Sequence, residues 1–148
     1  FLLLGNAFHS YGNGHEFKQL IAELGVADYF MFWDNFLSDE EFHTYIKSCD
    51  ILMPLLQTRP DGVNVYLEYQ ISGIYNLAFA YKKPMLFADD FEQMEEFKHS
   101  SIFYNKENLT TVLTSIKKSI ASLDTKLYQG KQWTLAFQAE RYLKFIEQ

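Results

Sequence analysis

The chain has 148 residues, of which 48% are hydrophobic and 18% aromatic, so it is not intrinsically disordered and is long enough for one buried core. The formal net charge is −6 without a cluster of basic residues, which argues against a nucleic-acid partner. The single cysteine, Cys49, cannot form an internal disulfide, so we expect a reducing, cytoplasmic location. No apolar stretch approaches the roughly 20 residues that a membrane-spanning helix needs.

Three short apolar stretches predict strands in the first part of the chain. They are residues 1–4, 29–33 and 51–53. The first stretch begins at the first residue, which is not Met, so we expect the chain to be a fragment of a longer protein.

Two helices are predicted between these strands. The first has apolar residues at helical spacing, at positions 17, 20, 21 and 24, and Gly25 marks its expected end. The second is expected to start at a capping box, which Ser38 and Glu41 form because they stand three positions apart. Its expected buried face comprises Phe42, Tyr45 and Ile46.

The rest of the chain continues the alternation of strands and helices. Residues 55–70 show no regular period and contain a turn signal at residues 59–62. The elements expected after this loop are a helix with an apolar stripe at positions 74, 77, 78 and 81, a strand at 85–87, a short acidic helix at 91–97, a short edge strand at 102–104, a helix capped by Asn105 with apolar residues at 109, 112, 113, 116 and 120, and a final helix at 131–148. The final helix is aromatic on more than one side, so it either bends or covers a partner with one face.

This alternation predicts an α/β fold. We expect a Rossmann-like, mainly parallel sheet with right-handed crossovers, helices on both faces and a long C-terminal helix. No linker or low-complexity tract divides the chain, so residues 1–148 are expected to form a single domain. The four histidines lack the paired spacing of a metal site, and we expect neither a metal nor another cofactor.

The stretch of residues 49–89 is the strongest candidate for a binding site. An apolar strand ends at Pro54, a polar loop follows, and Ser72 and Gly73 open a helix that leads to the next strand. Such a unit places free backbone amides and the positive end of a helix dipole at the carboxyl edge of a parallel sheet, where anions bind. We therefore expect the amides of residues 73–75 to receive a phosphate group. The alternative is an ordinary serine N-cap followed by a glycine that packing requires.

Three features of this stretch resemble a known family in their order and spacing. They are the strand at residues 50–54, the helix start at Ser72 and Gly73, and the turn at Lys83 and Pro84. Together they resemble the C-terminal domain of glycosyltransferases built from two Rossmann-like domains (the GT-B fold), in the family called glycosyl transferases group 1. The resemblance implies a domain that binds a nucleotide-diphosphate sugar, the donor in polysaccharide or glycoconjugate biosynthesis, without requiring a metal.

The resemblance also implies what this chain lacks. The acceptor-binding N-terminal domain of the same enzyme would be the missing partner, so the chain alone is expected to be inactive. In the family, an Arg and a Lys that neutralise the donor diphosphate precede the first strand, and we expect that this chain begins after them. No residue is therefore assigned a catalytic role. Peripheral association of the full-length enzyme with a membrane is left open.

Donor contacts follow residue by residue from the same resemblance. The two glutamates of the family align with Tyr69 and Leu77, neither of which is a carboxylate. Glu68, one residue from the first position, is a substitute if the loop shifts. Asn76, next to the second position, is either a hydrogen-bond partner for the ribose or a solvent-facing residue.

Further candidate contacts lie where the strands end and the helix opens. Phe36 would stack on the base or belong to the core, and Asn35 lies in the loop that holds the base in the family. Gly5 and Asn6 would line the ligand crevice or form a plain turn. The remaining candidates of this group are Pro54, Ser72, Gly73 and Ile74.

Two other interpretations stay open. The absence of both family glutamates fits a non-catalytic Rossmann-like module used for packing or regulation. A nucleotide-sugar epimerase of related fold is the third possibility. Nucleotide-sugar binding separates the first interpretation from the second, and product analysis separates the first from the third.

Overall fold

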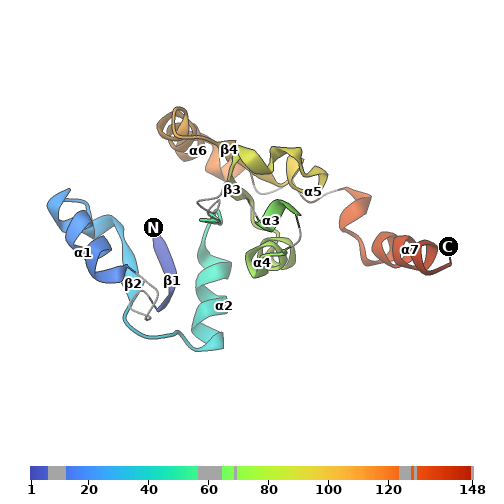
Figure 1. Cartoon of the computed structure of the whole chain (residues 1–148), viewed down its shortest axis with the longest axis horizontal. Coiled ribbons are helices and arrows are strands. Elements are labelled where there is room, and N and C mark those ends of the chain that lie inside the picture. Colours follow the sequence, from blue (N-terminus) through green and yellow to red (C-terminus); the bar gives the residue numbers. More distant parts are fainter. Residues whose placement is uncertain (7–12, 57–64, 69, 124–127, 129, 148) are drawn as a thin grey trace. The chain divides into compact units, whose positions relative to one another are not determined.

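The computed structural model describes the chain apart from residues 7–12, 57–64, 69, 124–127, 129 and 148. The chain divides into two compact units, Phe1–Cys49 and Asp50–Gln148 (Figure 1). Both units combine helices with a short pair of parallel strands, so the fold class is mixed α/β. Within the described ranges, no helix combines the length and the apolar character that crossing a membrane requires.

The first unit contains two parallel strands joined by a helix. In their register, Leu3 pairs with Phe32, and after a register shift Asn6 pairs with Trp33. The strands predicted at residues 1–4 and 29–33 are thus confirmed, although the second one is shorter than predicted because a 3-10 turn takes its first residue. The elements are β1 (Leu2–Asn6), α1 (Gly14–Glu23), the 3-10 helix η1 (Ala27–Tyr29), β2 (Met31–Trp33) and α2 (Asp39–Ser48).

Gly25 follows the end of α1, as predicted. Its φ of +65° lies in the left-handed region that favours glycine, and its N–H donates to the Ala22 carbonyl at 3.0 Å. The buried stripe of α1 is narrower than predicted, since Ile21 is buried whereas Leu20 and Leu24 are exposed.

The capping box at the start of α2 is confirmed. The Ser38 N–H donates to Glu41 Oε2 at 3.0 Å, and the Glu41 N–H donates to Ser38 Oγ at 3.3 Å. Two amides that would otherwise lack a partner are satisfied in this way. Of the expected buried face, Ile46 is buried, whereas Phe42 and Tyr45 are half-buried.

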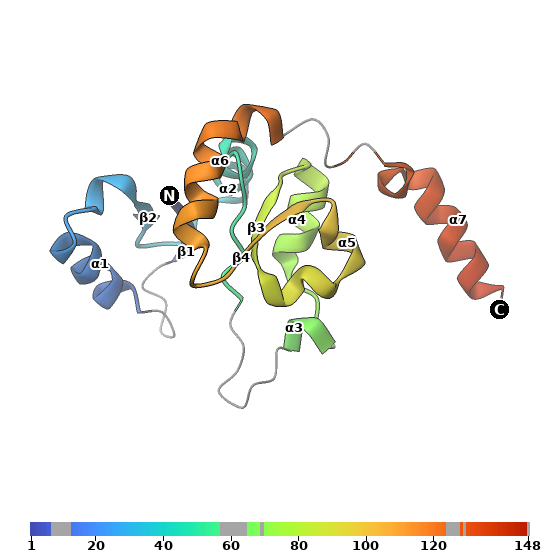
Figure 2. The ribbon, with the colours of Figure 1, turned by 90° about the horizontal axis from the view of Figure 1, so that it is seen from above.

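The second unit surrounds a parallel strand pair with helices. β3 and β4 pair in unbroken register, from Met85 with Ser101 to Ala88 with Tyr104. In both views these two strands lie between α4 and α6 (Figures 1 and 2). The elements are α3 (Val65–Glu68), α4 (Gly73–Tyr81), β3 (Met85–Ala88), η2 (Asp89–Gln93), α5 (Glu95–Lys98), β4 (Ser101–Tyr104), α6 (Leu109–Leu123), η3 (Lys131–Trp133) and α7 (Leu135–Ile146).

Leu52 adds a third parallel segment beside β3. Its N–H donates to the Pro84 carbonyl at 3.0 Å, and its carbonyl accepts from the Leu86 N–H at 2.8 Å. Only this residue of the strand predicted at 51–53 is paired in the described structure. Pro54, two residues further, carries no N–H and cannot extend the pairing.

An aromatic cluster forms the core of the second unit. Phe87 of β3, Phe91 of η2 and Phe97 of α5 are at most 1% exposed. The ring centroids of Phe87 and Phe91 lie 4.0 Å apart, and those of Phe87 and Phe97 lie 5.1 Å apart. Burying each of these rings contributes about 2 kcal/mol to stability. The cluster therefore fixes β3, η2 and α5 against one another.

Three expectations for the helices need correction. In α4 the buried residues are Tyr75 and Ala78, so only Ala78 of the predicted stripe is fully buried. The acidic helix predicted at 91–97 is two short helices, because Met94 has an extended conformation between η2 and α5. The final helix is interrupted at Thr134, whose extended backbone separates η3 from α7 and whose side chain caps α7.

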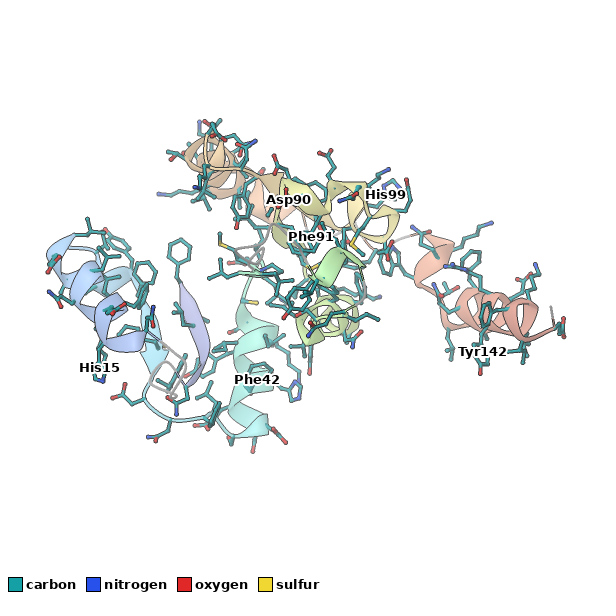
Figure 3. The ribbon with its side chains drawn as sticks, in the orientation of Figure 1. His15, Phe42, Asp90, Phe91, His99 and Tyr142 are labelled. Atoms are coloured by element: carbon teal, nitrogen blue, oxygen red, sulfur yellow. The ribbon has the colours of Figure 1, made fainter. Side chains whose placement is uncertain are left out.

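The exposed apolar residues of α7 bear on the prediction that the final helix either bends or covers a partner. The described residues show neither a bent helix nor a partner, since Thr134 divides the predicted helix into η3 and the separate helix α7. Leu135, Tyr142 and Phe145 of α7 are nevertheless well exposed, and Tyr142 projects away from the helix (Figure 3).

Candidate functional site

The carboxyl ends of three parallel segments meet at one edge of the second unit. Leu52, β3 and β4 run in the same direction, since each described pairing among them is parallel. The residues that follow them are Pro54, Asp89 and Asn105. α4 ends just before β3 begins, so the start of α4 lies toward this same edge. The edge therefore combines strand ends with a helix N-terminus, an arrangement that favours anion binding.

Two backbone amides at the start of α4 have no hydrogen-bond acceptor among the described residues. The described residues offer no hydrogen-bond acceptor to the N–H groups of Gly73 and Ile74. The N–H of Tyr75 donates to the Ser72 carbonyl at 3.1 Å, so the expectation of three available amides is reduced to two. Ser72 occupies the N-cap position, but its side chain makes no capping hydrogen bond. Ser72 is therefore the N-cap residue, as the alternative stated, but without the side-chain hydrogen bond of an ordinary serine cap.

Gly73 is not explained by the protein's own structure. Its φ is not positive, so the backbone conformation does not demand glycine. A Cβ at this position would have no described atom within 4 Å, and the residue is exposed. Packing against the described residues therefore does not require glycine at the start of α4 either.

A polar network joins the ends of β3 and β4. Asn105 Nδ2 donates to Asp89 Oδ2 at 2.9 Å. Asn105 and Asn108 exchange hydrogen bonds between side chain and backbone, at 2.8 and 3.0 Å, and so close the turn just before α6, which begins at Leu109 rather than directly after Asn105. Asp90 next to this network is exposed, whereas Phe91 turns into the core (Figure 3). Charges of both signs therefore lie at this corner, since the exposed Lys106 directly follows Asn105.

The described residues on either side of the start of α4 carry no basic side chain, although Lys106 follows Asn105 at the end of β4. Residues 50–56 and 65–81 contain neither Lys nor Arg, and Arg59 lies outside the described residues. Lys82 is at the opposite end of α4, where it adopts a left-handed conformation with φ of +52°. Within residues 65–81, a phosphate at the start of α4 would thus meet only neutral donors and the helix dipole.

The remaining predicted donor contacts are only partly placed. Glu68 ends α3, but its side chain is not described, and Tyr69 lies outside the described residues. Leu77 is half-buried on α4, in keeping with an apolar role. Asn76 is exposed and Pro54 is buried.

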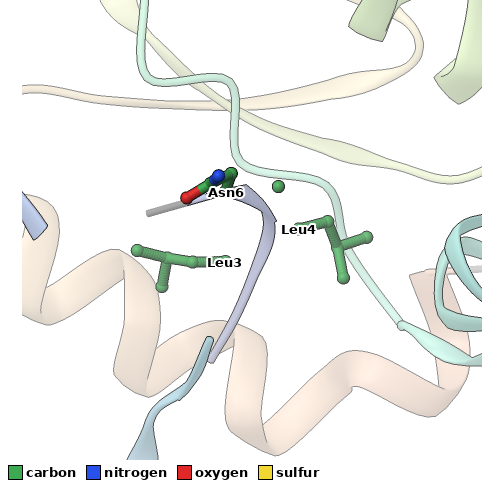
Figure 4. Close-up of a pocket in the computed structure, with 4 residues that line it drawn as sticks. Leu3, Leu4 and Asn6 are labelled. Carbon is green, nitrogen blue, oxygen red and sulfur yellow. The ribbon is translucent and has the colours of Figure 1, made fainter. Parts of the chain in front are cut away.

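The first unit has a comparable edge of its own. The pairing of Asn6 with Trp33 brings the end of β1 beside the loop that follows β2. A small hollow of about 150 Å³ is lined by Leu3, Leu4, Gly5 and Asn6 (Figure 4). Gly5 has a φ of +143°, which other residues rarely adopt, so the sharp path of β1 requires glycine there.

The loop after β2 is solvent-exposed. Phe36 is 70% exposed, so the alternative that placed it in the core is wrong, and Asn35 is exposed as well. Lys18 of α1 forms an ion pair with Asp34 at 3.2 Å, and its Nζ lies 5.1 Å from the centre of the Phe32 ring. The sequence offered no signal for this link, because its partners are 16 residues apart and share no motif.

The described residues contain no group of three or more acidic, His or Cys side chains that could hold a metal ion. No protein-family model, curated protein or solved structure matches the chain.

Proposed function

We propose that this chain is the donor-binding domain of a glycosyltransferase and that it binds the diphosphate of a nucleotide sugar at the start of α4. Gly73 is the observation that supports this most directly. It is a glycine that neither backbone conformation nor packing requires, and it opens a nine-residue helix with two free amides. A phosphate oxygen fits this position because it can approach the amides closely only where no Cβ intervenes.

The proposed fold is Rossmann-like. The parallel order of Leu52, β3 and β4, with α4 as the crossover, supports a nucleotide-binding half of this type. In the full-length enzyme the sugar would leave its diphosphate while the amides of Gly73 and Ile74 stabilise the departing phosphates. The acceptor and the catalytic groups would come from the N-terminal domain that the resemblance implies.

Leu77 favours a second candidate, a non-catalytic module. It is half-buried on α4 at the position that aligns with a ribose-binding glutamate, and a leucine cannot replace a carboxylate there. Such a module would keep the fold and lose nucleotide-sugar binding. The two candidates therefore differ in one measurable property.

Calorimetric titration with uridine diphosphate glucose and guanosine diphosphate mannose tests the proposal. Because residues 65–81 offer a phosphate no Lys or Arg, binding should be weak, with a dissociation constant of about 1 mM, or about 4 kcal/mol. Uridine and guanosine, which lack phosphate, are the matched controls and should not bind. The absence of saturable binding by both nucleotide sugars would favour the non-catalytic module. Micromolar binding would show that a basic side chain from outside residues 50–56 and 65–81 clamps the phosphate.

A further inference from the structure

Asn13 and Gly14 form the only Asn-Gly pair in the sequence. The pair lies where α1 begins, since Asn13 is the N-cap residue and Gly14 is the first residue of the helix. An N-cap asparagine commonly accepts a hydrogen bond from the helix through its side chain. Asn13 is exposed, and its side chain makes no such capping bond. The carboxamide of Asn13 is therefore not held by the helix that it precedes.

The backbone nitrogen of Gly14 is not engaged in a hydrogen bond either. The first N–H groups of a helix have no acceptor within the helix, and the described residues offer none to the Gly14 N–H. Gly14 also has no Cβ that would crowd the carbon next to this nitrogen. Gly14 is buried, but its nitrogen has to reach only the side chain of the residue directly before it.

This arrangement permits an intramolecular reaction of a chemically labile residue type. The Gly14 nitrogen loses its proton and attacks Cγ of Asn13. The new N–Cγ bond closes a succinimide ring, the Cγ–Nδ2 bond breaks, and the amide leaves as ammonia with one added proton. Water then opens the ring. Breaking the N–Cγ bond gives aspartate, and breaking the bond from nitrogen to the backbone carbonyl carbon gives isoaspartate.

We propose that Asn13 is a site of spontaneous deamidation in the folded chain. The ring places Cβ of Asn13 and the Gly14 nitrogen nearly in one plane, so ψ of Asn13 must rotate away from its value of 37°. This rotation breaks the hydrogen bond from the Phe17 N–H to the Asn13 carbonyl, which is 2.9 Å long. That bond belongs to the first turn of α1, and helix ends fray. The reaction is therefore accessible without unfolding of the rest of the helix.

The two products differ in their effect on α1. Both add one negative charge to the formal net charge of −6. Aspartate keeps the backbone and places its charge at the positive end of the helix dipole, where an anion is favourable. Isoaspartate lengthens the backbone by one methylene group and displaces the start of the helix. This inference does not depend on the proposed function.

The test incubates the folded chain at neutral and at mildly alkaline pH and follows each asparagine by peptide mass spectrometry. Asn13 should convert into two products of equal mass that chromatography separates. Conversion should be faster at the higher pH, because the attacking nitrogen must lose a proton. Asn35 is the internal control, since it is exposed in the same unit but is followed by Phe36. Asn13 should convert many-fold faster than Asn35.

Two variants locate the reaction. Gly14→Ala should slow conversion several-fold, because a methyl group crowds the nitrogen and restricts the backbone. Asn13→Gln alters only an exposed side chain and should abolish the fast conversion, because its longer side chain has to close a larger ring. Circular dichroism shows whether each variant folds, and Asn13→Gln keeps the test valid if Gly14→Ala does not.

Three results would overturn the proposal. Asn13 that stays intact in the folded chain, while the urea-unfolded chain converts, would show that the start of α1 blocks ring closure. Equal rates at Asn13 and Asn35 would show that the following glycine is not the cause. An undiminished mass gain in Asn13→Gln would place the modification at another residue.

Discussion

Replacing Gly73 by valine should damage ligand binding far more than folding. A Cβ at this position meets no described atom within 4 Å, so the larger side chain points into open space. Valine is a slightly better helix former than glycine, and we expect the free energy of unfolding to change by no more than about 0.5 kcal/mol. A phosphate at the start of α4 would lose its close approach to two amides. Losing even one charge-assisted hydrogen bond costs about 1.5–3 kcal/mol, so the dissociation constant should rise at least about tenfold.

The assay is an NMR titration with uridine diphosphate glucose, combined with thermal unfolding followed by circular dichroism. Gly73→Ala should give an intermediate loss of affinity, since one methyl group intrudes less than a branched side chain. Ala80→Val adds the same branched side chain on the exposed part of the same helix and should leave affinity unchanged. Unaltered affinity in Gly73→Val, or a loss that simply follows unfolding, would refute the assignment of Gly73 to a ligand contact.

Three further predictions concern stability and activity. Lys82→Gly should raise the free energy of unfolding by about 1 kcal/mol, because Lys82 holds a left-handed conformation that costs a side-chain-bearing residue energy; an unchanged urea midpoint would contradict this. The hydrogen bonds from Ser38 lower the pKa of Glu41 from its ordinary value of 4.5. Their contribution to the free energy of unfolding is therefore present above pH 4.5 and is lost as the pH falls through the lowered pKa of the folded chain. Ser38→Ala should therefore destabilise the chain more at pH 7 than at pH 3, as urea unfolding at both pH values would show, and an equal loss at both would count against the capping box. The chain alone should not transfer sugar from a nucleotide sugar to any acceptor, and robust turnover in a product assay would overturn its proposed role as half of an enzyme.

Local signals in the sequence predicted the elements that local interactions determine. The capping box of Ser38 and Glu41 was predictable because both partners lie within one helical turn. β3 was predictable because a continuous apolar stretch bounded by Pro84 is typical of a buried strand. The start of α4 was predictable for the same reason, since Ser72 and Gly73 precede a run of small and apolar residues.

Other features depend on contacts that the sequence pattern does not reveal. α4 is apolar on nearly every side, so the spacing of its apolar residues could not show that Tyr75 rather than Ile74 is the buried residue. The break at Thr134 had a local signal, because a threonine is a common N-cap and its side chain accepts a hydrogen bond from the N–H of Phe137, three residues on. The spacing of the aromatic residues across Thr134 nevertheless resembled that of one continuous helix. The open space beside Gly73 could be learned only from the three-dimensional structure.

Amide-resolved NMR of the chain during titration with uridine diphosphate glucose tests the central claim most directly. The claim is that a diphosphate binds the free N–H groups at the start of α4. We expect the amide signals of Gly73 and Ile74 to shift most and to saturate with one common dissociation constant near the millimolar range. Saturable shifts confined to other parts of the chain, or no saturable shift at these two amides, would contradict it.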